Sequence, residues 1–319
     1  MSINETNPAI ATKGLRKSYG DNVVLDGIDL SVPKGSVFAL LGPNGAGKTT
    51  IVNILSTLVG FDEGQVEVDG HNVVKEPDAV RAAIGVTGQF SAVDNLLTGE
   101  ENLVLMADLF HLPKVEGRQR IAELLERFDL VDVAKDTPTT YSGGMQRRLD
   151  LAMGLVGSPG IVFLDEPTTG LDPRGRHTVW ESIRRLASEH VTILLTTQYL
   201  EEADRLADRI GLLDDGVLVA EGTPAELKRL VPGGHISLHF TDSEHLESAA
   251  RALNAIGRDD EKLSLQVPGD GGVTAIRETL DQLDRHAVEV DSLTVHTPDL
   301  DDVFFALTGQ RTNKKESTS

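Results

Sequence analysis

A glycine-rich stretch at residues 42–50 carries the clearest chemical signal in this sequence. It fits the phosphate-binding pattern G-x-x-x-x-G-K-[ST]. Glycines let the backbone wrap closely around an anion and point successive N–H groups at it. Lys48 can then reach the β- and γ-phosphates of a nucleoside triphosphate, and the Thr49 hydroxyl can bind Mg²⁺. The predicted phosphate-binding residues are Gly42, Pro43, Asn44, Gly45, Ala46, Gly47, Lys48, Thr49 and Thr50.

Two carboxylates, Asp165 and Glu166, follow an apolar run at residues 160–164. Asp165 is suited to hold Mg²⁺ through water, and Glu166 is suited to polarise the attacking water molecule as a catalytic residue. The alternative is an apolar run that merely ends in loop carboxylates. Gln89 follows the predicted strand 84–87 and is a further candidate to touch Mg²⁺ or the attacking water, because strand ends of an α/β sheet face the ligand. An isolated glutamine is otherwise an ordinary turn residue.

Two more features are weak when taken alone. Ser142, Gly143 and Gly144 precede a predicted helix, so their N–H groups form a second anion-binding helix N-terminus. An ordinary Ser/Gly helix cap explains them equally well. Tyr19 is placed to stack on an adenine ring, but an exposed strand aromatic needs no such role.

The pattern of apolar and polar residues predicts the elements that must position these side chains. Strands are expected at 10–17, 23–32, 36–41, 64–70, 84–87, 160–164, 191–197, 210–213 and 217–221. Helices are expected after residue 49 and at 78–83, 100–112, 114–128, 145–156, 174–189 and 200–208. The candidate site residues therefore fall at strand ends and helix starts, as in an α/β sheet.

Composition limits the class of protein. The 319 residues suggest two domains at about 150 residues each. Every apolar run is far shorter than the ~20 residues that span a bilayer, so we expect a cytosolic chain unless a partner holds it at a membrane. Fifty acidic against 30 basic residues give a net charge of −20, which argues against nucleic acid as a partner. Without cysteine, disulfides and thiolate metal sites are excluded.

The order and spacing of these motifs resemble an ABC-type ATPase cassette over about residues 9–230. The resemblance implies a mixed sheet with an antiparallel β subdomain, and a helical subdomain at about 95–158. It also implies an ATPase that binds ATP and Mg²⁺. The matching positions are Tyr19, Gly42–Thr50, Gln89, Ser142–Gly144, Asp165, Glu166, Leu171, Asp172 and Gln198.

The resemblance also implies partners. In such cassettes two copies enclose two ATP molecules, and Ser142–Gly144 of one subunit closes on the γ-phosphate held by Lys48 of the other. Glu166 is then the general base, and Asp172 lies in the loop that bridges the subunits. The segment from Gln89 to about Leu97, with the helices after it, is the expected docking surface for transmembrane permease subunits. Such a subunit is peripheral, at the cytoplasmic face of the cell membrane.

Two positions depart from the usual pattern of the family. Residues 141–146 read Tyr-Ser-Gly-Gly-Met-Gln instead of the commoner Leu-Ser-Gly-Gly-Gln form, with the Ser-Gly-Gly core intact. Gln198 stands where the family usually has a histidine that contacts the γ-phosphate. A glutamine can donate an N–H there, but it carries no positive charge at any pH. Hydrolysis is therefore expected to depend more on Lys48 and Glu166.

A narrower resemblance lies in residues 86–89, 140–145, 196–204 and 298–309, which are similar to daunorubicin-resistance-type ATP-binding subunits of actinobacterial drug exporters. This implies export of a hydrophobic drug, antibiotic or lipid-like substrate. A non-transport ATPase acting on ribosomes or DNA is a weak alternative, because this chain has one cassette and no sustained heptads. A nucleotide-gated module with little turnover, suggested by Gln198, is opposed by the intact carboxylate pair at 165 and 166.

Residues 235–309 are predicted to form a small α+β domain after a linker at 231–234. Its strands are expected at 235–240, 262–267 and 288–295, and its helices at 243–256, 273–286 and 300–307. Its histidines are scattered without metal-ligand spacing, so core or surface histidines are the better interpretation. Residues 310–319 have the composition of a disordered tail.

Overall fold

The computed structural model describes residues 8–89, 92–231, 234–269, 272–296 and 298–307. The chain divides into two compact units, Met1–Pro224 and Ala225–Ser319. We placed the boundary at 230–235, whereas this division assigns most of helix α8 (Pro224–Lys228) to the second unit. The predicted disordered tail at 310–319 lies outside the described residues.

A six-stranded sheet forms the centre of the first unit, with the strand order β10-β9-β3-β8-β7-β6. β3, β6, β7, β8 and β9 run parallel, and β10 is antiparallel to β9. Every residue of β3, β7 and β8 is buried, as expected of parallel strands covered on both faces. The strands are β3 (Val37–Leu41), β6 (Ile84–Thr87), β7 (Ile161–Asp165), β8 (Thr192–Thr197), β9 (Arg209–Asp214) and β10 (Val217–Gly222).

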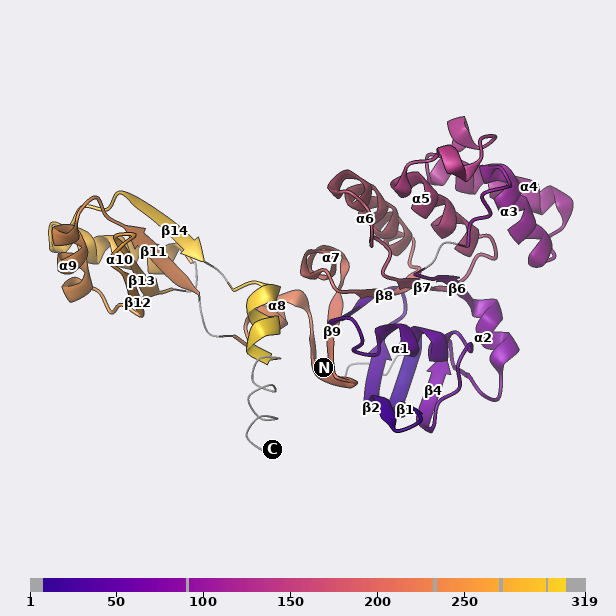
Figure 1. Cartoon of the computed structure of the whole chain (residues 1–319), viewed down its shortest axis with the longest axis horizontal. Helices are drawn as coiled ribbons and strands as arrows, with labels where there is room; N and C mark the ends of the chain where they lie inside the picture. The colour runs from indigo at the N-terminus through magenta and orange to yellow at the C-terminus, as the bar shows by residue number, and fades with distance from the viewer. Residues whose placement is uncertain (1–7, 90–91, 232–233, 270–271, 297, 308–319) are drawn as a thin grey trace, which may run out of the picture. The chain divides into compact units, whose positions relative to one another are not determined.

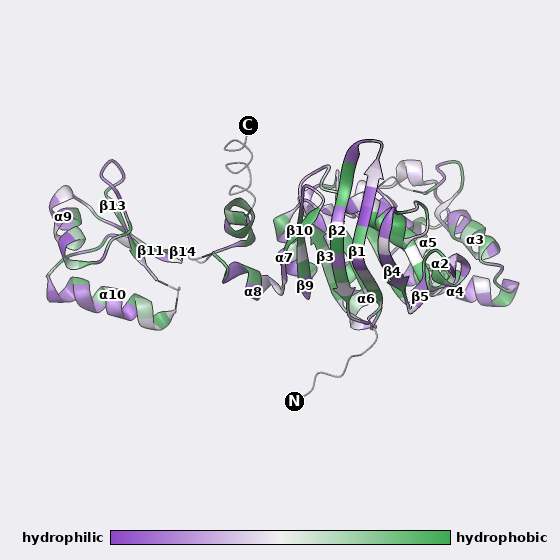
Figure 2. Ribbon diagram, turned by 90° about the horizontal axis from the view of Figure 1, so that it is seen from below, coloured by the Kyte–Doolittle hydropathy of each residue, from purple (hydrophilic) through white to green (hydrophobic). Residues whose placement is uncertain are grey.

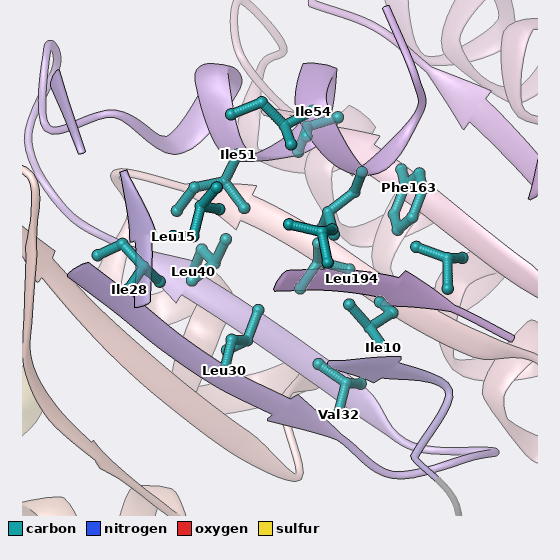
Figure 3. Packing of buried hydrophobic residues seen from close by; sticks show 14 of the residues in the cluster. Ile10, Leu15, Ile28, Leu30, Val32, Leu40, Ile51, Ile54, Phe163 and Leu194 are labelled. Atoms are coloured by element: carbon teal, nitrogen blue, oxygen red, sulfur yellow. The ribbon is translucent and has the colours of Figure 1, made fainter. Parts of the chain in front are cut away.

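A second sheet of this unit is antiparallel, with the strand order β2-β1-β4-β5. Its apolar side chains form one buried core with those of helix α1 (Lys48–Leu55) and of the central sheet. Figure 3 shows Ile51 and Ile54 of α1 above apolar side chains from both sheets, Leu40 and Leu194 among them. This shared core fixes the start of α1 relative to the strand ends. The strands are β1 (Ile10–Tyr19), β2 (Asn22–Val32), β4 (Glu63–Val68) and the two-residue β5 (His71–Asn72).

The remaining helices of the first unit connect the parallel strands. In both views α3 and α4 lie together beside α5, away from β1 and β2 (Figures 1 and 2). α3 begins with a capping box, in which the side chains of Thr98 and Glu101 each accept a backbone N–H of the other residue. These helices are α2 (Pro77–Ala83), α3 (Gly99–Leu109), α4 (Lys114–Arg127), α5 (Gly143–Gly154), α6 (Pro173–Ser188) and α7 (Leu200–Leu206).

The second unit contains a βαββαβ arrangement with the antiparallel sheet order β12-β13-β11-β14. Apolar side chains of β11 and β13 form one buried core with those of α9 and α10. Figure 2 shows hydrophilic and hydrophobic residues alternating along α10. The elements are β11 (His235–His239), α9 (Ser243–Ala252), β12 (Gly257–Asp259), β13 (Ser264–Pro268), α10 (Val273–Arg285), β14 (Ser292–His296) and a helix at 300–307.

The prediction of one helix over 243–256 was wrong at its C-terminal end. α9 stops at Ala252, and the N–H of Ile256 donates to the carbonyl of Gln266 at 2.8 Å. Pairing of β12 with β13 therefore replaces the last helical turn, a tertiary effect that local periodicity does not reveal. None of the helices in the described part of the chain combines the length and apolar character needed to cross a bilayer.

Candidate ATP-binding site

Four neighbouring parallel strands, β3, β8, β7 and β6, end at one edge of the central sheet. Each end leads into a predicted site segment: Gly42 after β3, Gln198 after β8, Glu166 after β7 and Gln89 shortly after β6. Parallel strands place their carboxyl ends together, so residues far apart in the sequence share this edge. The sheet order thus brings together the main predicted residues of the nucleotide site.

The loop between β3 and α1 depends on its glycines. Gly45 and Gly47 have φ angles of +85° and +106°, in the left-handed region that favours glycine. A Cβ atom on Gly42 would lie 2.1 Å from the carbonyl oxygen of Leu213, so no side chain fits there. The loop ends at Lys48, the first residue of α1, and the backbone N–H groups of that helix start are available to an anion.

Lys48 is held inside the loop, with a side chain only 4% exposed. Its Nζ atom donates to the carbonyl oxygens of Gly42 at 2.7 Å and Pro43 at 3.0 Å. It also lies 3.6 Å from Oε1 of Glu166. Burial lowers the pKa of Lys48, and the negative charge of Glu166 partly offsets that shift.

Glu166 has a φ angle of +49°, which is uncommon for a residue with a side chain. Its backbone N–H donates to both the carbonyl and the hydroxyl oxygen of Thr196, at 3.2 and 3.0 Å. The hydroxyl of Thr169 donates to Oε2 of Glu166 at 3.1 Å. Backbone and carboxylate are thus fixed by neighbours on both sides, which aims the carboxylate at Lys48.

Thr49 and Asp165 present two oxygen donors side by side. The Thr49 hydroxyl donates to Oδ1 of Asp165 at 3.3 Å, and the hydroxyl of Thr196 donates to the same oxygen. A hydroxyl next to a buried carboxylate suits Mg²⁺, which prefers few protein oxygens and shares its sphere with phosphate and water. Among the described residues, no group of three or more His, Cys, Asp or Glu side chains could hold a metal ion by itself.

Three other predicted site residues are Tyr19, Gln89 and Gln198. Tyr19 ends β1 with 52% of its surface exposed, and Nζ of Lys17 lies 5.0 Å from the centroid of its ring. Gln89 is exposed and Gln198 is half-buried. The three positions leave side chains accessible to a ligand, and their predicted roles stay predictions.

Ser142–Gly144 and Asp172 line a separate cavity of the same unit. Ser142 caps α5 by accepting the N–H of Met145 at 3.3 Å, and Asp172 caps α6 by accepting that of Gly175 at 2.8 Å. The two helix starts are close, because a Cβ on Gly144 would lie 3.3 Å from Cα of Gly175. They line a cavity of ≈ 670 Å³ that includes no residue of the 42–50 loop.

Tyr141 explains one departure from the usual motif. Its hydroxyl donates to the carbonyl oxygen of Val133 at 2.6 Å, and the side chain is buried. A Cβ on Gly99 would lie 2.3 Å from the same hydroxyl, so the first residue of α3 must be small. Within the helical subdomain, the tyrosine therefore ties the residues just before α5 to Val133 through a hydrogen bond that a leucine could not make.

Sequence reasoning missed three residues of this region. Thr196 donates to the Asp165 carboxylate and accepts the backbone N–H of Glu166. Glu202 is fully buried, and Arg147 reaches the ends of two strands. The only signals in the sequence are a threonine near a strand end, an acid within an amphipathic helix and an Arg-x-x-Asp spacing on α5. Each is common on surfaces, so only their burial identifies them.

Comparisons with known proteins agree with this geometry. Residues 25–169 match the family described as ABC transporter. The chain is 48% identical over 311 residues to the daunorubicin resistance ATP-binding protein DrrA3 of Streptomyces coeruleorubidus, covering 97% of this chain and 98% of that protein. It is 47% identical to the daunorubicin/doxorubicin resistance ATP-binding protein DrrA of Streptomyces peucetius, over 94% of this chain and 92% of that one.

A solved cassette, described as a dimeric post-hydrolysis state bound to ADP and Pi, aligns with a TM-score of 0.60 and 27% identity over 67% of this chain and 98% of that chain. The fold and the site define an ABC-type ATPase. The chain belongs to the ATP-binding subunits of ABC transporters, within the daunorubicin/doxorubicin-resistance family. The predicted family, fold class and ATPase activity are thereby confirmed.

Proposed function

We propose that this ATPase acts as a dimer that drives separate transmembrane permease subunits, at the cytoplasmic face of the membrane, to export a hydrophobic drug, antibiotic or lipid-like substrate. Support for the export comes from relatives that are named for resistance to daunorubicin and doxorubicin. Support for the dimer comes from the site itself, as follows.

One observation carries the dimer proposal: the cavity at Ser142–Gly144 is lined by no residue of the phosphate loop. A nucleotide bound at Lys48 therefore needs a second copy of the chain to supply the serine and glycine N–H groups. Helix N-termini bind phosphate well, so each copy offers one phosphate loop and one closing surface. The dimeric arrangement reported for the related cassette bound to ADP and Pi is consistent with this.

Residues of one chain then have distinct roles toward ATP. The loop N–H groups and Lys48 bind the β- and γ-phosphates, and Tyr19 stacks on the adenine. Thr49, Asp165 and Gln89 would hold Mg²⁺, which neutralises phosphate charge when it is bound. Gln198 donates an N–H to the γ-phosphate.

The hydrolytic step transfers the γ-phosphoryl group of ATP to water, with ADP as the leaving group. Glu166 orients the water molecule and accepts its proton as the oxygen bonds to phosphorus and the bond to the leaving oxygen of ADP breaks. In the described structure this carboxylate is paired with Lys48 at 3.6 Å. Phosphates compete for that ammonium, so nucleotide binding frees Glu166 to act as a base.

The proposed docking surface for the permease lies on the helical subdomain. It comprises Gln89 to about Leu97 with α3 and α4, of which residues 90–91 lie outside the described part. Leu96 is 89% exposed there, and Leu109 and Val115 are 63% and 82% exposed. Exposed apolar residues grouped on one subdomain are typical of a protein–protein contact.

Mixing two inactive variants tests the shared site. Ser142→Asp keeps a good helix-capping residue but places a negative charge against phosphate, and Ser142→Asn keeps the cap without charge. Lys48→Ala removes the phosphate contact. A mixed dimer of Lys48→Ala and Ser142→Asp contains one site with both intact partners, so ATP hydrolysis should reappear on mixing.

The control replaces the second component by a chain carrying both Lys48→Ala and Ser142→Asp, which can form no intact site. Recovery in the first mixture alone supports the proposal. If neither mixture hydrolyses ATP while Ser142→Asn is active, the loop and the serine of one chain act on the same nucleotide, and the shared site is wrong.

A further inference from the structure

A buried ion pair on α5 lies behind the ATP site and has no role in the function proposed above. Arg147 and Asp150 are 8% and 3% exposed, and Nη1 of the arginine lies 2.9 Å from Oδ2 of the aspartate. Burying two charges is costly unless further hydrogen bonds satisfy them. The other hydrogen-bond partners of Arg147 and Asp150 therefore show which backbone segments this ion pair fixes in place.

The guanidinium group of Arg147 donates to three backbone carbonyls from two strand ends. Nη1 reaches Gly88 at 2.9 Å, after β6. Nη2 reaches Asp165 at 3.2 Å, and Nε reaches Pro167 at 2.8 Å, both at the end of β7. The planar fork of an arginine can make these contacts at once, which a single ammonium cannot.

Asp150 extends this arrangement along the segment after β6. Its Oδ1 atom accepts the backbone N–H of Ala92 at 3.2 Å. The pair thus holds residues on both sides of Gln89, namely Gly88 and Ala92. It also holds Asp165 and Pro167, the two neighbours of Glu166.

We propose that Arg147 and Asp150 are positioning residues that fix the backbone around Gln89 and Glu166 relative to the start of α5. This role rests on the proposed function and deepens it. It explains what fixes Gln89 and Glu166 in position relative to Ser142–Gly144 at the start of α5. A shift of the docking segment after Gln89 is then passed to Glu166 through one guanidinium group.

The test is steady-state hydrolysis and nucleotide binding by Arg147→Lys in the full chain. Lysine keeps the charge and the pairing with Asp150 but reaches fewer of the carbonyls. We expect kcat to fall at least tenfold, while the Kd for ATP and the KM stay within about twofold, because the contacts of the 42–50 loop are unchanged. A purely structural ion pair would lower thermal stability without this separation of kcat from KM.

Arg185→Lys is the matched control. That arginine donates from α6 to the carbonyl of Arg127 at 2.6 Å, away from the ATP site, so its kcat should equal that of the parent chain. Asp150→Asn keeps an oxygen for Ala92 and should lower kcat less than Arg147→Lys. In the double variant with Arg147→Lys, Asp150→Asn should lower kcat by a smaller factor than it does alone, because the two residues act together.

The outcomes separate this inference from the proposed function. A parent chain that does not hydrolyse ATP contradicts the function, whatever the variants do. An active parent with Arg147→Lys at parental kcat, or with equal losses in kcat and ATP affinity, overturns the positioning role. If Arg147→Lys does not fold, the same comparison of kcat with the Kd for ATP is made on Asp150→Asn. A parental kcat in Asp150→Asn then overturns the positioning role.

Discussion

Nζ of Lys48 lies 3.6 Å from Oε1 of Glu166, and their side chains are 4% and 8% exposed. The ammonium and the carboxylate form a buried ion pair. In the function proposed above, Lys48 is also the residue that binds the phosphates of ATP. We therefore expect nucleotide binding to draw Lys48 away from Glu166, which would connect ATP binding to catalysis.

Lys48→Ala should weaken ATP binding strongly. Charge-assisted hydrogen bonds contribute about 1.5–3 kcal/mol, which is roughly 10- to 150-fold in affinity. Calorimetric titration with ATP measures this. Lys34→Ala is the control, because Lys34 is an exposed residue whose Nζ pairs with Oδ1 of half-buried Asp69 at 2.7 Å. Unchanged affinity in Lys48→Ala would count against the loop assignment.

Glu166→Gln should preserve ATP binding and trap a closed dimer. Loss of a general base typically costs 10²–10⁴-fold in rate, so we expect kcat to fall by about that amount. Size-exclusion chromatography with light scattering should show a dimer that persists with ATP. Glu189→Gln, which alters an exposed partner of Arg127, should behave as the parent chain. Normal hydrolysis by Glu166→Gln would remove Glu166 from its role.

Gln198→Ala should slow hydrolysis less than Glu166→Gln does. A neutral hydrogen bond contributes about 0.5–1.5 kcal/mol, so the expected loss is roughly 2- to 12-fold in kcat. Gln198→His should make kcat depend on pH near the histidine pKa of about 6.5, because it adds a charge below that pH. A loss in Gln198→Ala as deep as that of Glu166→Gln would show that the amide is as necessary as the carboxylate.

Glu202 should make the first unit less stable as pH rises. The side chain is fully buried, and its Oε1 accepts hydrogen bonds from Trp180 at 2.9 Å and from Thr168 at 2.8 Å. Burial raises its pKa above 4.5, so the folded state binds more protons than the unfolded state. By linkage, its stabilisation is complete below pH 4.5 and declines as pH rises toward the raised pKa.

Urea unfolding at pH 5 and pH 8 checks this, with the fluorescence of Trp180, the sole tryptophan, reporting on the first unit. Glu202→Gln should lose less stability between the two pH values than the parent chain. Glu201→Gln is the control, since Glu201 is exposed and pairs with Arg205 at 3.1 Å. An identical pH dependence in Glu202→Gln and the parent would refute the assignment.

Much of the architecture could be predicted from local patterns. Buried strands such as β7 appear as apolar runs, and glycines with a required geometry, such as Gly47, appear inside a recognisable motif. The end of α9 could not be predicted, because pairing of β12 with β13 overrides a helical periodicity. Boundaries fail where a partner far along the chain competes for the same backbone groups.

The sequence by itself determined the chemistry of the site: a lysine in a glycine loop, a carboxylate pair after a strand, and a Ser-Gly-Gly helix start. Those signals are local, because each needs only residue type and the neighbouring element. The tertiary structure alone decided three features. They are the pairing of Lys48 with Glu166, the placement of Ser142 in a cavity that no residue of the 42–50 loop lines, and the hydrogen bonds from Arg147 to two strand ends. These are set by the order of strands in the sheet, which brings distant residues together and leaves no periodic trace in the sequence.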